Sequence, residues 1–102
     1  MERNYIFVLY VNGKVHKTYN WFCEDEKTMR LLSIGLSAGA RAFKKTAGVL
    51  VYQLQEDMNY HICHSVDFKS NWQVLHKTFS SQLVENKQNL TEKLGSMMGL
   101  TA

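Results

Sequence analysis

The fold is decided by the N-terminal stretch of residues 4–21, NYIFVLYVNGKVHKTYNW. Asn12-Gly13 stands between two apolar runs, and this dipeptide readily adopts the positive φ angles of a type I′ hairpin turn. We therefore predict a hairpin of residues 4–11 and 14–21. A two-residue turn also sets the register of the two strands. The predicted partners are Val11 with Lys14, Tyr10 with Val15, Leu9 with His16, Val8 with Lys17, and Ile6 with Tyr19.

The predicted hairpin has two different faces, because side chains alternate along a strand. One face is apolar except for Lys17 and is the expected core face: Ile6, Val8, Tyr10, Val15, Tyr19 and Trp21. The other face carries Tyr5, Phe7, Leu9 and Val11 beside Lys14, His16, Thr18 and Asn20. The first strand is apolar on both sides, which is typical of a central strand, whereas the second alternates as an edge strand does.

A helix is predicted after the acidic cluster Glu24-Asp25-Glu26, because carboxylates stabilise the free N–H groups of a first helical turn. Its apolar residues recur at spacings of three and four, with Gly48 as the expected end: Met29, Leu32, Leu36, Ala40, Phe43 and Ala47. Gly35 and Gly39 lie inside this segment among Ser33, Ser37, Ala38 and Ala40. These small residues either allow another backbone to approach closely or interrupt the helix.

A second strand pair is predicted at Val49–Gln55 and Asn59–Val66, with a turn around Glu56-Asp57-Met58. The expected core face of this pair contains Leu50, Tyr52, Leu54, Tyr60, Ile62 and Val66. The opposite face contains Val49, Val51, Gln53, His61, Cys63 and Ser65.

A second helix is predicted from Ser70, where Ser70-x-x-Gln73 has the pattern of a capping box. Its apolar stripe runs to the expected end at Gly95: Trp72, Leu75, Phe79, Leu83, Leu90 and Leu94. Residues 1–94 are therefore expected to form a single α+β domain, and residues 95–102 a flexible C-terminal tail.

The element order β-β-α-β-β-α predicts an α+β fold, a four-stranded antiparallel sheet with two helices packed on one face. The other face of the sheet would then be open. Because an apolar patch of that size is seldom left in water, we predict that it binds a partner, with a homodimer as the first expectation. The predicted interface residues are Tyr5, Phe7, Leu9, Val11, Val49 and Val51.

Length and composition describe one ordinary globular domain, with 102 residues, 45% of them hydrophobic and 21% charged. These values exclude the collagen-like, low-complexity and strongly disordered classes. Cys23 and Cys63 are too few for the disulfide framework of a small secreted protein. The apolar run of residues 5–11 is too short to span a bilayer and lacks the features of a signal peptide. We expect a cytoplasmic protein with no membrane partner.

Basic residues support an alternative hypothesis, which is RNA or DNA binding. The formal net charge is +3, and a cluster of cations near the end of the first helix could neutralise phosphates. Tyr5 and Phe7 could stack on bases. The candidate residues for phosphate contact are Lys14, Lys17, Arg30, Arg41, Lys44 and Lys45. The opposing interpretation is that cations in a last helical turn simply complement the helix dipole.

Residues with catalytic or metal-binding chemistry do not form a recognisable motif. In the run His61-Ile62-Cys63-His64, alternation along a strand puts His64 on the face opposite to His61 and Cys63, so this run cannot supply three zinc ligands from one side. His16 and Cys23 would have to complete the site. The sequence also lacks a nucleophile elbow and the Gly-Lys-Ser/Thr ending of a phosphate-binding loop. We expect no enzymatic activity, cofactor or metal.

The function expected from these features is that of a small regulatory or inhibitory binding protein. It would be non-catalytic and would act through protein–protein contacts, in the first instance as a homodimer. In its small size, its Lys and Asn usage and its lack of Pro, the chain looks like the small accessory proteins of large lytic phages. This resemblance rests on composition alone and covers no motif.

Overall fold

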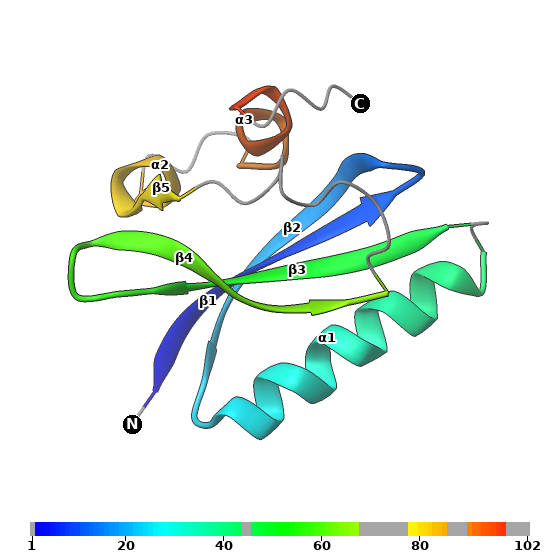
Figure 1. Cartoon of the computed structure of the whole chain (residues 1–102), viewed down its shortest axis with the longest axis horizontal. Coiled ribbons are helices and arrows are strands. Elements are labelled where there is room, and N and C mark those ends of the chain that lie inside the picture. The colour runs from blue at the N-terminus through cyan, green and yellow to red at the C-terminus, as the bar shows by residue number, and fades with distance from the viewer. Residues whose placement is uncertain (1, 44–45, 68–77, 86–89, 98–102) are drawn as a thin grey trace.

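The chain folds into an α+β domain around a single antiparallel sheet. The structure is a computed structural model that describes residues 2–43, 46–67, 78–85 and 90–97. Its elements in chain order are β1 (Arg3–Val11), β2 (Lys14–Cys23), α1 (Glu26–Arg41), β3 (Ala47–Leu54), β4 (Asn59–Val66), β5 (Phe79–Ser80), α2 (Ser81–Glu85) and α3 (Leu90–Met97). The strand order in the sheet is β2-β1-β3-β4-β5 (Figure 1). The α+β class is confirmed, but the sheet has five strands rather than four.

The helices cover opposite faces of the sheet, so the prediction that two helices pack on one face is wrong. In Figure 1, α1 lies along one side of the sheet, and α2 and α3 lie on the other side. The physical reason is the sequence of the two central strands. β1 and β3 are buried along almost their whole length, and strands that are apolar on both sides need a cover on each face.

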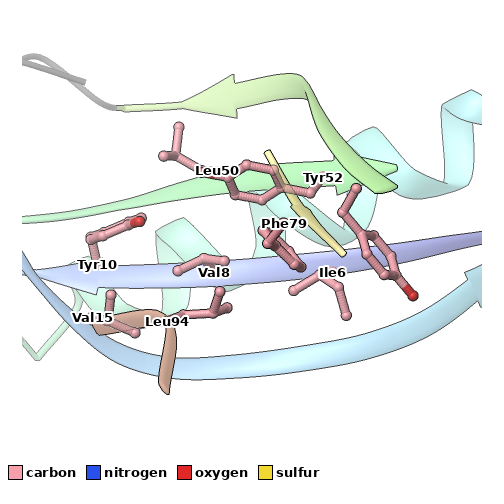
Figure 2. Packing of buried hydrophobic residues seen from close by; sticks show 9 residues of the cluster. Ile6, Val8, Tyr10, Val15, Leu50, Tyr52, Phe79 and Leu94 are labelled. Atoms are coloured by element: carbon pink, nitrogen blue, oxygen red, sulfur yellow. The ribbon is translucent and has the colours of Figure 1, made fainter. Parts of the chain in front are cut away.

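Two hydrophobic cores result, one on each side of the sheet. The core beneath α3 is shown in Figure 2 and consists of Ile6, Val8, Tyr10, Val15, Leu50, Tyr52, Tyr60, Phe79 and Leu94. The core beneath α1 consists of Tyr5, Phe7, Leu9, Cys23, Met29, Val49 and Val51. This second core contains five of the six residues predicted to form an open interface, and each of the five is at most 6% exposed. Val11, the sixth, is half-buried against the same core. The expectation of an open sheet face is therefore wrong.

The N-terminal hairpin has the predicted turn but a different register beyond it. Asn12 and Gly13 have φ angles of 53° and 79°, and the pairs Val11–Lys14 and Tyr10–Val15 are confirmed. A β-bulge follows at His16, so that Leu9 faces Lys17 rather than His16. From there on every pair is shifted by one residue, including Val8 with Thr18 and Ile6 with Asn20.

The bulge changes which side of β2 enters which core. A slip of one residue moves a side chain to the other face of a sheet. Tyr19 and Trp21 therefore pack on the α1 side, where the rings of Trp21 and Phe7 are 5.1 Å apart. In the predicted register Lys17 would face Val8 on the α3 side. The polar but uncharged Thr18 takes that place instead, and its Oγ1 lies 3.1 Å from Oγ1 of Thr91 in α3.

The β3–β4 pair and its turn are confirmed, again with one bulge. Cys63 has no partner in β3, because Tyr52 pairs with Ile62 whereas Val51 pairs with His64. As a result Val66 faces Val49 and packs on the α1 side, not beside Leu50 as predicted.

Helix α1 begins as predicted and ends earlier than predicted. The Asp25 carboxylate caps it by accepting a hydrogen bond from the Thr28 N–H at 2.7 Å. The helix runs through Gly35 and Gly39 without interruption and ends at Arg41. Ala47 and Gly48, predicted as the helix end, belong to β3 and pair with β1. Pairing with a central strand has prevailed over the local helical pattern there.

The C-terminal part of the chain departs most from the predicted single helix. Phe79 and Ser80 form a strand that pairs with Tyr60 and Asn59 of β4, and the Phe79 ring stacks on that of Tyr60 at 5.0 Å. Helix α3 continues past Gly95 to Met97. The predicted capping box at Ser70, the stripe residues Trp72 and Leu75, and residues 98–102 of the tail lie outside the described residues.

Candidate protein-binding surface

The middle of helix α1 has its two polar side chains inside and several of its large apolar side chains outside. The ten residues Leu31–Ala40 contain no charged side chain, and their only polar side chains are Ser33 and Ser37. Both serines are 0% exposed, whereas Leu31 is 60% and Ile34 is 52% exposed. A helix on the surface of a sheet normally has the opposite arrangement.

The two serines face the sheet because they are small and because each has a hydrogen-bond partner. The Ser33 hydroxyl donates to the backbone carbonyl of Arg30, and the Ser37 hydroxyl donates to Oδ2 of Asp67, both at 2.7 Å. Buried hydroxyl groups with such partners carry little desolvation penalty. Small side chains also let the helix backbone approach the sheet closely. Of the predicted stripe, Met29, Leu36 and Ala40 do pack on the α1-side core.

Two other stripe residues, Leu32 and Phe43, point away from the core. Leu32 is 37% exposed and Phe43 is 87% exposed. We use the name "outer apolar face" for the exposed residues Leu31, Leu32, Ile34, Gly35, Ala38, Gly39 and Phe43. Arg30 and Arg41 border this part of the helix, and no charged residue lies between them in the sequence.

A groove of about 320 Å³ continues the outer apolar face toward the sheet. It lies between α1 and the first two strands, and its lining consists of Leu9, Val11, His16, Tyr19, Gly35, Leu36, Gly39, Ala40 and Phe43. Gly35 and Gly39 belong to both the groove and the outer apolar face. A Cβ atom added at either glycine would meet no other heavy atom within 4 Å. Packing among the described residues therefore does not require glycine at these two positions.

Replacing either glycine by alanine should stabilise the fold. We expect Gly35→Ala and Gly39→Ala each to raise the free energy of unfolding by roughly 0.5–1 kcal/mol, because alanine is the better helix former and the space is free. Urea denaturation followed by circular dichroism measures the change. Gly13→Ala is the matched control and should destabilise, because Gly13 has a φ of 79°. A loss of stability in both helix variants would show that the helix packs more tightly at these positions than the structure indicates.

The basic residues proposed for phosphate binding are partly occupied within the chain. Arg30 forms an ion pair with Glu26, and Arg41 forms one with Asp67, both at 3.0 Å. Lys14 and Lys17 are exposed on β2, with Nζ of Lys17 5.3 Å from the Tyr19 ring centroid. Lys44 and Lys45 lie outside the described residues. Tyr5 and Phe7 are buried beneath α1, so the expectation that they stack on bases is wrong.

The histidines and cysteines are separated in the fold. Cys23 is buried under α1, Cys63 is exposed at the β4 bulge, and His16 lines the groove. The His61 ring lies 2.8 Å from the Asp57 carboxylate in the β3–β4 turn. Burial and the nearby Arg30 guanidinium lower the pKa of His64. Within the described ranges, no three His, Cys, Asp or Glu residues form a group that could hold a metal ion.

Comparisons with known proteins give no relative from which a function could be proposed. No family model, no curated protein and no solved structure matches this chain. The helices in the described part of the chain include none that is long and apolar enough to cross a membrane.

The predicted stripe does not include the exposed residues Leu31 and Ile34, although a signal for them is present in the sequence. The run LLSIGLSAGA offers two apolar faces to a helix, one with leucine and isoleucine and one with small residues. Only the large residues on one stripe were expected to be buried. In the structure the small residues Ser33 and Ser37 face the sheet beside Met29 and Leu36.

Proposed function

We propose that the protein is a small, non-catalytic binding protein of a regulatory or inhibitory kind, which acts through protein–protein contacts made by the outer apolar face of α1 and the adjoining groove. The observation that carries the proposal is the pattern of burial in the middle of α1. Leu31 and Ile34 are more than half exposed, while Ser33 and Ser37 of the same turns are buried.

Energetics support a partner on this surface. Fully burying a leucine or isoleucine side chain stabilises an assembly by about 1.5–3 kcal/mol. Contiguous exposed apolar residues on a soluble domain commonly mark a binding site. Gly35 and Gly39 add a second argument, since glycine inside a helix costs roughly 0.5–1 kcal/mol relative to alanine without any packing reason in this chain. A partner that must approach the helix backbone closely would account for both glycines.

The chemistry of the surface also indicates what kind of partner fits. The groove is lined by apolar residues and by His16, so a protein segment with a projecting apolar side chain would fill it. Two charged pairs flank the helix, Arg30 with Glu26 and Arg41 with Asp67, and provide a polar border. An apolar centre with a polar rim is the usual composition of a protein–protein interface.

The test compares three forms of the protein as bait in extracts of its native cells, with nuclease treatment. The forms are the wild type, the double variant Leu31→Gln with Ile34→Gln, and the control Lys27→Gln. Glutamine retains helix propensity and the positions are exposed, so the fold should be retained. We expect a protein that the wild type and the control retain and that the double variant binds roughly 10–100-fold more weakly.

Two outcomes would contradict the proposal. The first is an identical set of retained proteins for all three baits, which would place binding elsewhere. The second is retention that disappears with nuclease and depends on Lys14 and Lys17, which would favour the nucleic-acid hypothesis. In that case binding should also weaken steeply with salt.

A further inference from the structure

Strand β2 is an open edge of the sheet. Among the strands that the described residues form, in the order β2-β1-β3-β4-β5, β2 has a neighbour on one side only. It is ten residues long, and alternate residues of an edge strand turn their N–H and C=O groups outward, ready to pair with another strand. The opposite edge offers a shorter run, because β5 pairs with Asn59 and Tyr60 and the bulge at Cys63 interrupts the rest of β4.

Only the first half of β2 carries the features that protect an edge. Lys14, Lys17 and the bulge at His16 all lie there, and lysines and bulges are the usual devices against edge pairing. Helix α3 lies beside Val15 at this same end of the strand (Figure 2) and reaches as far as Thr18, whose hydroxyl lies 3.1 Å from that of Thr91. The second half, Thr18–Cys23, is regular in its pairing with β1 and contains no charged residue. Its Phe22 side chain is 64% exposed.

The charges at the two ends of this unprotected segment are complementary. Lys14 and Lys17 precede it, and Glu24 follows it directly. All three side chains are exposed. If a second copy of β2 pairs in the antiparallel direction, the basic end of each strand lies beside the acidic end of the other. A second copy of the chain therefore fits this edge better than a strand of another protein that lacks a basic start and an acidic end.

One register aligns the side chains best. A two-fold axis beside Asn20 makes Asn20 face its own copy, Tyr19 face Trp21 and Thr18 face Phe22. Tyr19 and Trp21 already contact each other within one chain, with ring centroids 4.6 Å apart, so the aromatic row would continue across the axis. Aromatic cross-strand pairs are among the stabilising ones. The same register brings Lys17 within one position of Glu24 of the other copy.

From these features we propose that the protein forms a homodimer in which β2 pairs antiparallel with β2 of a second copy about Asn20, joining two sheets into one. This surface contains no residue of the outer apolar face of α1, and it adjoins the groove at Tyr19. It replaces the face-to-face dimer expected from the sequence, whose interface residues α1 covers.

The first test is the molar mass of the whole chain in solution. Light scattering at about 100 µM should give twice the 11.8 kDa of one chain, with dissociation on dilution. Asn20→Lys places two ammonium groups opposite each other on the axis and should weaken the dimer at least roughly tenfold. Gln82→Lys, the same charge change at an exposed position of α2, is the control and should leave the mass unchanged.

Cross-linking then tests the register. In a Cys63→Ser background, Asn20→Cys should form an intermolecular disulfide under mild oxidation, because facing residues have Cα atoms about 4.5–5.5 Å apart. Phe22→Cys is the control. Its two copies would be four residues out of register, about 13 Å apart, and should not be joined.

A wild-type chain that is monomeric at every concentration would overturn the proposal. So would a dimer that persists in Asn20→Lys and gives no disulfide in Asn20→Cys. A dimer abolished by the α1 double variant Leu31→Gln with Ile34→Gln would also overturn it. The failure of this inference is thus separable from failure of the proposed function, which concerns binding of a different protein.

Discussion

Phe7→Ala should lower the free energy of unfolding by about 3–5 kcal/mol, a large part of the stability of a domain of this size. The Phe7 side chain is 0% exposed and lies at the centre of the core beneath α1. Its ring centroid is 5.1 Å from that of Trp21 and 6.3 Å from that of Tyr5. Removing the ring leaves a cavity that the flanking strands cannot close. Urea denaturation monitored by circular dichroism measures the change.

Phe22→Ala is the matched control for this experiment. Phe22 is in the neighbouring strand β2 and is 64% exposed, so its truncation should change the free energy of unfolding by no more than about 0.5 kcal/mol. Equal, small effects of the two substitutions would mean that α1 does not cover this face of the sheet. The open face expected from the sequence would then be the better description.

Leu94→Ala should lower the free energy of unfolding by about 2–5 kcal/mol. Leu94 is 0% exposed and is the residue of α3 that enters the core with Val8, Tyr10 and Val15 (Figure 2). If α3 did not pack on this face of the sheet, the substitution would have little effect. The same denaturation experiment distinguishes the two.

The control for Leu94→Ala is the identical change on the other helix. Leu31 is 60% exposed in α1, and Leu31→Ala should leave the free energy of unfolding nearly unchanged. If both leucine substitutions cost the same, the assignment of one leucine to the core and the other to a binding surface would be contradicted.

Local signals predicted much of the fold. The Asn12-Gly13 turn, the cap at Asp25 and the strand pair on either side of Glu56-Asp57 are all present. Each of these depends on a few adjacent residues with strong conformational preferences. Errors began where distant parts of the chain compete, as at Ala47 and Gly48, where pairing with β1 replaces the helix that the local pattern favours.

The candidate surface was harder to predict than the fold. Periodicity identifies an apolar stripe but cannot choose between two stripes on one helix. In α1 the buried side combines Ser33 and Ser37 with Met29 and Leu36 of the predicted stripe, whereas Leu32 is exposed. A small serine lets the helix approach the sheet, and Asp67, which directly follows β4, accepts the Ser37 hydrogen bond. That acceptor is thirty residues away in the chain, so no local pattern could reveal it.

The sequence by itself determined that β1 and β3 are strands, that a hairpin turns at Asn12-Gly13, and that α1 begins at the acidic cluster. These features follow from side-chain hydrophobicity and backbone preference at single positions. Only the tertiary structure decided which elements cover each face of the sheet, where the bulges shift the strands, and which side of α1 meets solvent. Those outcomes depend on packing and hydrogen bonding between segments far apart in the chain. Which side of α1 is buried, for example, depends on its contacts with the sheet and with Asp67.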